Sequence, residues 1–587
     1  MSFLINFGII TNLTMMKKLK IALLGGGPSA LYMYKQLIES ADSDYDITIF
    51  EKRGRLGAGM PYSGIGANSE HITNVSGNEI PSLMENVEDW IRRKDPQQLI
   101  RYGLSAESYH EYKVLPRLVF GSYLEDQFSL LLKSAEQKGI KTQLLLNTEV
   151  TDVSDRPVED KVRVFYGSGM HRGFDKIVIC TGHFWPRKHE STVPGYYDSP
   201  YPPAKLSLHL NHPVALRGSS LTAIDAIRTL ARHNGRFIRT ASGSLSYQLY
   251  AESKEFRIVM HWRHGFLPAV RFHLDDPHLK NASLLTTEEI QKHRAANEGF
   301  ISLDFMFTND FIALFKAKEP DFYQRVKNMN VEDFVDYVMS YREEQDSFAL
   351  LCSEYFEAEQ SIKRHRTIYW KELLAVLSFA MNYPAKYLSA EDMLRLKKVL
   401  QSLISVVIAF VPQSSCRELI ALHQAGCLDI VAVGEESEVI PLPEGGITYR
   451  YRDQQGQYTS TFFSTFVYCT GQCALPFEQF LFQGLLYDGT VSPARLKFRS
   501  QAKAASAMKS GAPVTDFKGD FFLTVPGIAV TDHFAVVDRE GLASRRVYMM
   551  AVPFMGGFNP DYSGLDFCEA ASVEICKALR KQEEIYA

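Results

Sequence analysis

The chain has 587 residues, of which 45% are hydrophobic and 22% charged, and its formal net charge is −4. At roughly 150 residues per domain, this length allows about three or four folded units. The near balance of acids and bases excludes a broad positive surface, so we expect neither nucleic acid nor an anionic membrane as a partner.

The cysteines and the N-terminal stretch limit the class of protein further. The eight cysteines form no CxxC pair and no Cys/His spacing of a metal site, so we expect reduced thiols, no metal, a cytoplasmic location and no relation to disulfide reductases. The stretch 1–17 has no cleavage signal and is expected to be a disordered tail. No apolar run approaches the roughly 18 residues of a membrane-spanning helix.

Residues 18–51 read as a complete βαβ unit. The strand KLKIALL leads into the turn Gly25-Gly26-Gly27-Pro28-Ser29-Ala30, a helix follows, and DITIFE forms the next strand. The turn fits G-x-G-x-x-[GA], in which Gly25 permits the tight turn, Gly27 admits a pyrophosphate and Ala30 allows close packing. Glu51, at the end of the second strand, is expected to accept hydrogen bonds from the adenosine ribose. This pattern predicts a dinucleotide site.

FAD is favoured over NAD in this first unit by the loop that follows. Glu51-Lys52 leads into RLGAGMPY, where Gly57 and Gly59 resemble the loop along the flavin diphosphate in flavoproteins with two dinucleotides. An ordinary surface glycine loop is the alternative. The strand DKIVIC then ends at Thr181-Gly182, and the same ending recurs at Cys469-Thr470-Gly471. The repeated strand ends and turns suggest a duplicated architecture.

A second strand, turn and helix begin at PVALRGSSLTAIDAIRTLARHNG, and FRIVMHW is the next strand. In this turn Gly218 keeps the first glycine, but Ser220 replaces the middle one and crowds the path of a pyrophosphate. The unit is expected to bind NADPH or NADH, with a degenerate Rossmann-like domain as the alternative. Arg263 is placed to pair with a 2′-phosphate, which would select NADPH, or it is a solvated loop residue.

These patterns predict an α/β fold with two Rossmann-like dinucleotide-binding domains, for FAD and NAD(P), and a helical insertion. The insertion is acidic, lysine-rich and aromatic, with helical periodicity. The expected division is a FAD-binding domain in two parts, an NAD(P)-binding domain in two parts and the insertion. In chain order the parts are 18–210 (FAD), 211–275 (NAD(P)), 276–408 (insertion), 409–475 (NAD(P)) and 476–587 (FAD).

The chain resembles the bacterial FAD/NAD(P)-binding protein family and is distantly similar to flavin-containing and N-hydroxylating monooxygenases. The motifs that carry the resemblance include IALLGGGPSAL, HITNVSGNEIP, LPRLVFGSYL, ICTGHFWP, RHGFLP and GGFNPDYSGLDF. The resemblance implies that Asn74 lies near the isoalloxazine, that Val150 contacts adenine through its backbone and that Thr181-Gly182 lines the FAD site. It also implies that Arg117 and Tyr123 border the flavin.

The resemblance implies a monooxygenase that uses NADPH, FAD and O2, forms a C4a-hydroperoxyflavin and oxygenates a small nucleophilic substrate, an amine first of all. The chain lacks the F-x-G-x-x-x-H fingerprint of typical flavin-containing monooxygenases after CTGHFWP. Alternatives are an NAD(P)H-dependent flavin reductase or oxidase and a non-catalytic flavin-binding sensor. No side chain is assigned a catalytic role, since the flavin carries the chemistry. Substrate and oligomeric state stay open.

Overall fold

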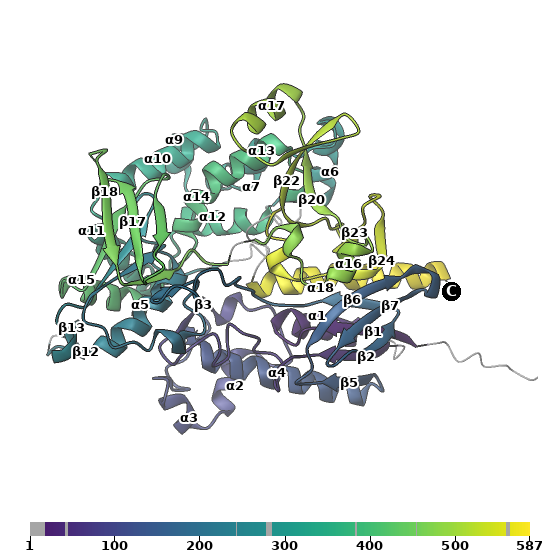
Figure 1. Ribbon diagram of the computed structural model, residues 1–587, viewed down its shortest axis with the longest axis horizontal. Coiled ribbons are helices and arrows are strands. Elements are labelled where there is room, and N and C mark those ends of the chain that lie inside the picture. The colour runs from purple at the N-terminus through teal and green to yellow at the C-terminus, as the bar shows by residue number, and fades with distance from the viewer. Residues whose placement is uncertain are drawn as a thin grey trace, which may run out of the picture.

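The computed structural model describes most of the chain. The described residues are 18–40, 45–241, 243–276, 284–381, 384–453, 455–472, 474–558 and 564–586, with side chains up to position 581. The predicted tail, 1–17, lies outside them. Two α/β units lie side by side, and a group of helices lies across the top of both in Figure 1.

The first unit is a six-stranded sheet in the order β23-β24-β9-β1-β2-β5. Its strands are parallel except β23, which pairs antiparallel with β24. The central strand β1 ends in four fully buried residues, as expected for a parallel sheet covered by helices on both faces. The strands are β1 (Leu19–Leu24), β2 (Tyr45–Phe50), β5 (Lys141–Leu145), β9 (Lys176–Ile179), β23 (Ala535–Val537) and β24 (Ala543–Met549).

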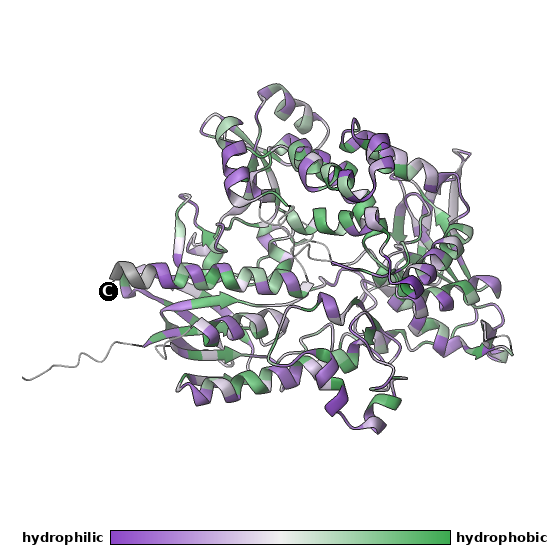
Figure 2. Ribbon diagram, turned by 180° about the vertical axis from the view of Figure 1, so that it is seen from behind, coloured by the Kyte–Doolittle hydropathy of each residue, from purple (hydrophilic) through white to green (hydrophobic). Residues whose placement is uncertain are grey.

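Helices from distant parts of the chain cover this sheet. Helices α1 and α18 pack against each other, and Lys35 Nζ lies 2.9 Å from Glu569 Oε1 between them. The helix that ends at the C mark in Figure 2, α18, alternates between hydrophobic and hydrophilic residues, as expected for a helix with one buried face. The helices are α1 (Pro28–Ser40), α4 (Arg117–Gln137) and α18 (Gly564–Tyr586).

The second unit is a five-stranded, fully parallel sheet in the order β10-β19-β11-β14-β15. Helices α5 and α15 connect its strands, and the hairpin β12–β13, which follows α5, forms a separate two-stranded sheet. Its elements are β10 (Tyr196–Tyr197), β11 (Pro213–Arg217), α5 (Leu221–Asn234), β12 (Gly235–Arg239), β13 (Leu245–Leu249), β14 (Arg257–Trp262), α15 (Gln413–Gln424), β15 (Leu428–Ala432) and β19 (Thr465–Tyr468).

Both units follow the same order of elements. In each, a third parallel strand is followed by a three-stranded antiparallel meander and by a return strand beside the first strand, β9 in one unit and β19 in the other. The predicted fold class, two Rossmann-like units, is therefore confirmed. The meanders are β6 (Val150–Arg156), β7 (Lys161–Tyr166) and β8 (Met170–Phe174), and β16 (Glu438–Pro441), β17 (Ile447–Arg452) and β18 (Tyr458–Phe463).

The region between β14 and α15 is helical, as predicted for the insertion. Its aromatic and aliphatic side chains, such as Phe307, Phe334 and Leu373, are buried in the same core cluster as the first unit. None of the helices in the described stretches is long and apolar enough to cross a bilayer. The longer helices are α6 (Thr287–Ala296), α10 (Val331–Glu343), α11 (Ser347–Arg364) and α12 (Tyr369–Ala380), and α13 (Ala390–Arg395) and α14 (Gln401–Val407) flank a π-helical turn at Leu396–Leu400.

Helix α2 (Val87–Arg93) begins after Asn86, which caps it by accepting a hydrogen bond from Asp89 N. The structure differs from the predicted domain division in one place. Strand β10 belongs to the second sheet, although it precedes the predicted boundary at 211. The other predicted domain limits stay a proposal.

Candidate dinucleotide sites

A cavity of about 560 Å³ opens at the carboxyl ends of β1, β2 and β9. In open parallel sheets, ligands bind at this edge. Ten predicted FAD-site residues line the cavity. They are Gly25, Gly27, Pro28, Ser29, Glu51, Lys52, Gly59, Val150, Thr181 and Gly182.

The glycine turn at the cavity is shaped by the strand beside it. Gly25 has φ +117°, and a Cβ there would lie 2.7 Å from the carbonyl oxygen of Cys180, so a larger residue is excluded by both strain and overlap. A Cβ on Gly27 would lie 3.3 Å from Gly59 Cα, where the two glycine loops approach each other. The N-terminus of α1 opens on this narrow passage, which suits a pyrophosphate.

Glu51 supports the same turn with its side chain. Its Oε2 accepts a hydrogen bond from Gly26 N at 2.8 Å, and its Oε1 accepts one from Arg53 N at 2.9 Å. Each carboxylate oxygen can accept a further bond, so ribose hydroxyls can bind without breaking these contacts. Thus Glu51 both orders the turn and offers the predicted ribose acceptor.

A buried polar atom provides a test of whether FAD fits. The Thr181 hydroxyl has no hydrogen-bond partner among the described residues, although buried hydroxyls normally have one. It belongs to a residue that lines the cavity beside the glycine turn. The unpartnered hydroxyl, the glycine passage and Glu51 together fit a bound dinucleotide with ribose and phosphate groups.

Four residues assigned to the first site do not line the cavity. Ala30 is fully buried in α1, as its predicted packing role requires. The carbonyl of Asn74 accepts a hydrogen bond from Arg271. Arg117 is directed toward the second unit, and Tyr123 donates a hydrogen bond to Glu85 O within the first unit's core. The placement of Asn74, Arg117 and Tyr123 beside the flavin therefore stays a prediction.

Arg117 takes part in a polar network between the two units. Its Nη1 donates to Asp225 Oδ2 at 2.6 Å, and Tyr201 OH donates to the same oxygen at 2.6 Å. Burial works against charge on Asp225, but Arg117 lowers the pKa of this carboxyl. Nearby, His71 Nε2 lies 3.1 Å from Thr229 Oγ1, and burial lowers the pKa of His71. These contacts fix how the units meet, so we assign them a structural role.

The second turn repeats the backbone geometry of the first. Gly218 has φ +122°, and a Cβ there would lie 2.5 Å from the carbonyl oxygen of Cys469. Gly218 N donates to His261 O at 2.9 Å, as Gly25 N donates to Phe50 O at 2.9 Å. The Thr470 hydroxyl is also buried without a partner among the described residues. The second unit thus retains the same strand and turn framework.

The side chains around the second turn are different. By the hydrogen-bond register, Trp262 occupies the position of Glu51, and Arg263 follows it. Arg263 is 59% exposed and lies 3.8 Å from Glu435, itself exposed, so it is only weakly held. Ser220 begins α5 without a side-chain capping hydrogen bond. The second unit therefore has a tryptophan where the first has the acid Glu51, and its arginine comes one residue later.

The loops that follow the two Thr-Gly pairs touch each other. Phe184 N donates to Gln472 Oε1 at 2.9 Å, and Gln472 Nε2 donates to Phe184 O at 2.7 Å. Because Phe184 also lines the cavity, these reciprocal bonds connect the first site with the corresponding edge of the second sheet. Two dinucleotides bound at these edges would face the same junction.

Several residues that line the cavity were not predicted. Thr148 and Glu149 adjoin the predicted Val150, so that assignment could have been extended by two residues. The C-terminal contributors carry no local signal except the GLDF motif, because long-range folding brings them to the turn. These contributors are Leu481, Phe482, Val552, Gly564, Leu565 and Cys568.

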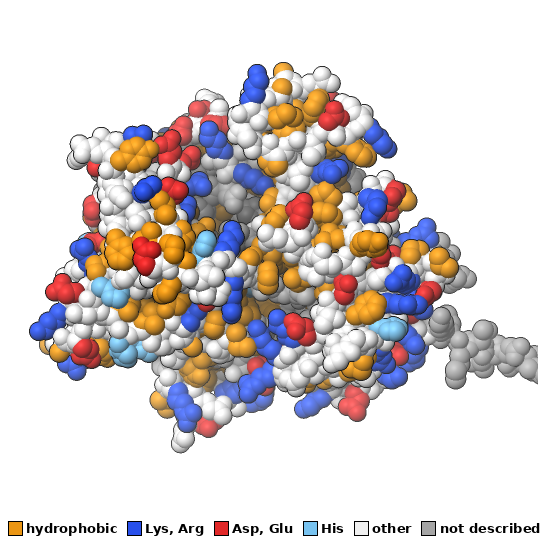
Figure 3. Space-filling model, in the orientation of Figure 1, with side chains coloured by type: hydrophobic (Ala, Val, Ile, Leu, Met, Phe, Trp, Pro, Cys, Tyr) orange, Lys and Arg blue, Asp and Glu red, His pale blue; other side chains and the backbone are white. Residues whose placement is uncertain are grey.

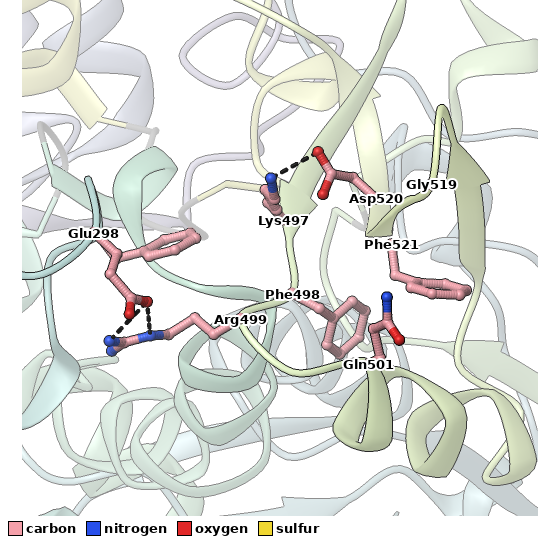
Figure 4. A pocket seen from close by; sticks show the side chains of 9 residues that line it. Glu298, Lys497, Phe498, Arg499, Gln501, Gly519, Asp520 and Phe521 are labelled. Atoms are coloured by element: carbon pink, nitrogen blue, oxygen red, sulfur yellow. Dashed lines mark hydrogen bonds and ion pairs between the residues drawn. The ribbon is translucent and has the colours of Figure 1, made fainter.

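A smaller hollow of about 350 Å³ lies between the insertion and the C-terminal region. Figure 4 shows that its charged side chains pair with each other, Arg499 with Glu298 and Lys497 with Asp520. On the face shown in Figure 3, basic and acidic side chains are likewise intermixed. The hollow thus offers no unpaired charge among its described lining residues and is not a candidate for the dinucleotides.

Comparisons with known families agree with the geometry of the cavity. Residues 22–184 match the family model described as FAD-NAD(P)-binding. These residues form an FAD/NAD(P)-binding domain. This match confirms the predicted resemblance to FAD/NAD(P)-binding proteins and the predicted kind of cofactor. Residues 286–408 match the YdhS-like middle domain, which falls within the predicted insertion.

The chain is similar over nearly its full length to a protein of Escherichia coli strain K12, the uncharacterized protein YdhS. The two are 27% identical over 569 residues, which cover 96% of this chain and 97% of YdhS.

Among solved structures, the ornithine N-hydroxylase KtzI of Kutzneria sp. 744 is 13% identical, with 97% of this chain and 100% of KtzI covered and a TM-score of 0.42. DfoA, the cadaverine monooxygenase of Erwinia amylovora, is also 13% identical, with 96% and 94% covered and the same TM-score. These values are too low to transfer either reaction to this chain.

Proposed function

We propose that the first unit binds FAD and the second binds a nicotinamide dinucleotide, NADPH in preference to NADH. The observation that carries this proposal is the repeated turn with different side chains around it. Glu51 suits ribose hydroxyls in the first unit, and Arg263 suits a 2′-phosphate in the second. The remaining first-site assignments, Gly25, Gly27, Pro28, Ser29, Lys52, Gly59, Val150, Thr181 and Gly182, and the second-site assignments, Gly218 and Ser220, are part of the same proposal.

We further propose that the reaction is the oxygenation of a small nucleophilic substrate, a primary amine first of all. FAD, when bound, accepts hydride from the nicotinamide and supplies electrons to O2. In the overall balance, amine, O2, NADPH and a proton give hydroxylamine, NADP⁺ and water. The motif resemblance to N-hydroxylating monooxygenases supports amines as the first substrates to test.

The contribution of the protein in this proposal is to position the dinucleotides and exclude water. The insertion reaches the C-terminal part of the chain through Tyr387, whose hydroxyl donates to Asp532 at 2.6 Å, and through Lys386, which lies 2.7 Å from the same carboxylate. An insertion held against the C-terminal part of the chain is suited to keeping water away from reacting groups. This supports a monooxygenase over a simple reductase or oxidase.

A sensor without catalysis is the second candidate, and Ser220 is the observation that favours it. Its side chain occupies the turn position where Gly27 leaves a passage in the first unit. If Ser220 blocks the pyrophosphate, the second unit retains only the fold. In that case the protein would hold FAD without reducing it from a nicotinamide.

The test is to supply the purified, FAD-loaded protein with NADPH, O2 and a panel of small primary amines. We expect NADPH oxidation to be stimulated by one amine and matched by hydroxylated product. If NADPH is consumed but every amine yields only hydrogen peroxide, the protein is an oxidase. If NADPH is not consumed at all, the sensor proposal replaces the monooxygenase.

A further inference from the structure

The segment after β14 is held by donors from the second dinucleotide turn and from two helices of the insertion. Gly265 O accepts a hydrogen bond from Ser347 Oγ at 2.6 Å, Phe266 O accepts one from Ser219 Oγ at 2.7 Å, and Leu267 O accepts one from Arg342 Nη2 at 3.0 Å. We call residues 265–267 the carbonyl clamp. It links the second dinucleotide turn, through Ser219, with the helical insertion, through Ser347 and Arg342.

The donors on the insertion are themselves fixed. Arg342, on α10, also donates to Glu354 Oε1 at 2.8 Å, and Lys371 donates to the same oxygen at 3.1 Å. Burial opposes charge on Glu354, but Lys371 and Arg342 lower its pKa, so the network stays ionised at neutral pH. Ser347 is the first residue of α11, directly after the capping residue Asp346. The side chain of Arg342 is therefore held within the insertion by an ionised network.

The other side of the segment is held by the second unit itself. Gly434 N donates to Arg263 O at 3.0 Å, and Val433 N donates to Trp262 O at 3.0 Å. The backbone carbonyls of Trp262 and Arg263 are thus held at the end of β15. The clamp begins two residues after Arg263 and holds the chain from there. In Rossmann units this loop faces the ribose of the bound dinucleotide.

We propose that Ser347 and Arg342 are positioning residues for the second dinucleotide site. They act through the clamp, which sets the loop that carries Arg263 and, through Ser219, the turn itself. The role of the insertion thus extends from covering the junction to shaping the nicotinamide site. The identity of the ligand in this inference, a nicotinamide nucleotide, rests on the proposed function. The hydrogen bonds of the clamp do not depend on it.

The test compares Ser347→Ala with Ser402→Ala in the full chain. Ser402 also lies in the insertion and donates to a backbone carbonyl that is not part of the clamp, Val399 O. Loss of one hydrogen bond at the clamp is expected to weaken NADPH binding, measured by calorimetry, about 3- to 10-fold. FAD content should not change, Ser347→Thr should restore the affinity, and Ser402→Ala should bind NADPH like the wild type.

Hydrogen exchange of the protein without nicotinamide nucleotide provides the second readout. Ser347→Ala should exchange faster in peptides covering residues 216–226 and 262–268, while Ser402→Ala should not. If the wild type binds no nicotinamide nucleotide, the proposed function fails, but the exchange data still decide whether the clamp positions the turn. Hydrogen exchange in Ser347→Ala that equals that of the wild type would overturn the inference. If the wild type binds NADPH, an equal NADPH affinity of Ser347→Ala and Ser402→Ala would also overturn it.

Discussion

The two dinucleotide units share one backbone design but differ in the side chains that a ligand would meet. In both, a glycine with positive φ packs against the carbonyl of the residue that follows a neighbouring strand. The next residue is a threonine whose buried hydroxyl has no hydrogen-bond partner among the described residues. Gly27 and Glu51 in the first unit correspond to Ser220 and Trp262 in the second. The comparison indicates that the first glycine serves the fold, and we propose that the later positions select the ligand.

The largest effect on cofactor binding is expected from replacing Gly27, at the narrow passage between the two glycine loops, by valine. Gly27→Val would fill the space between the glycine loops, so the purified variant should be colourless, while Ser220→Val should stay yellow and lose NADPH binding. Visible absorbance and calorimetry measure the two outcomes. If Ser220→Val also lost its flavin, the proposed division of the two ligands between the units would be wrong.

The next effect concerns selection between the nicotinamide nucleotides. Because Arg263 is exposed and only weakly paired with Glu435, Arg263→Ala should not disturb the fold. Loss of a charge-assisted hydrogen bond should weaken NADPH binding on the order of 10- to 100-fold and leave NADH nearly unchanged. Equal losses for both nucleotides would indicate that Arg263 shapes the loop instead.

Site residues that lie close together in the sequence could be predicted, and those that come from distant parts of the chain could not. The glycine turn, Glu51 and Thr181 could be predicted, because a local strand, turn and helix pattern places them at one sheet edge. Leu481 and Phe482 could not, since only tertiary packing brings them to the cavity. Asn74, Arg117 and Tyr123 were assigned by resemblance alone, and the structure places them among other contacts.

A smaller effect on FAD affinity should distinguish Thr181 in the first unit from Thr470 in the second. The Thr181 hydroxyl has no protein partner in the described structure, so Thr181→Val should not lower the free energy of unfolding of the apoprotein. It should weaken FAD binding about 2- to 10-fold, the value of one hydrogen bond. Thr470→Val is the matched variant and should retain FAD affinity. Denaturant unfolding and FAD titration distinguish a ligand contact from a purely structural role.

The smallest effect should come from restoring the glycine that the second turn lacks. Since Ser220 makes no side-chain capping bond, Ser220→Gly should cost only a few tenths of a kcal/mol in stability. It should tighten NADPH binding about 2- to 5-fold, because the passage for the pyrophosphate widens. Weaker binding by calorimetry would show that the serine hydroxyl itself contacts the nucleotide.

The helical insertion marks the limit of sequence-based prediction here. Its periodicity and composition predicted helices. The clamp could not be predicted, because Ser347 and Arg342 donate to backbone carbonyls, which have no sequence signature, some 75 to 82 residues earlier in the chain. Similarly, Trp262 was recognised as the counterpart of Glu51 only from the register of the strands.

The central claim, that one unit holds FAD and the other delivers a nicotinamide to it, is tested most directly by anaerobic titration of the FAD-loaded protein. Flavin absorbance is recorded while NADPH or NADH is added. We expect NADPH to bleach the flavin stoichiometrically and at lower concentration than NADH, and Ser220→Val to keep its flavin unbleached. A wild-type protein that binds no FAD, or whose bound flavin stays oxidised with both nucleotides, would contradict the account.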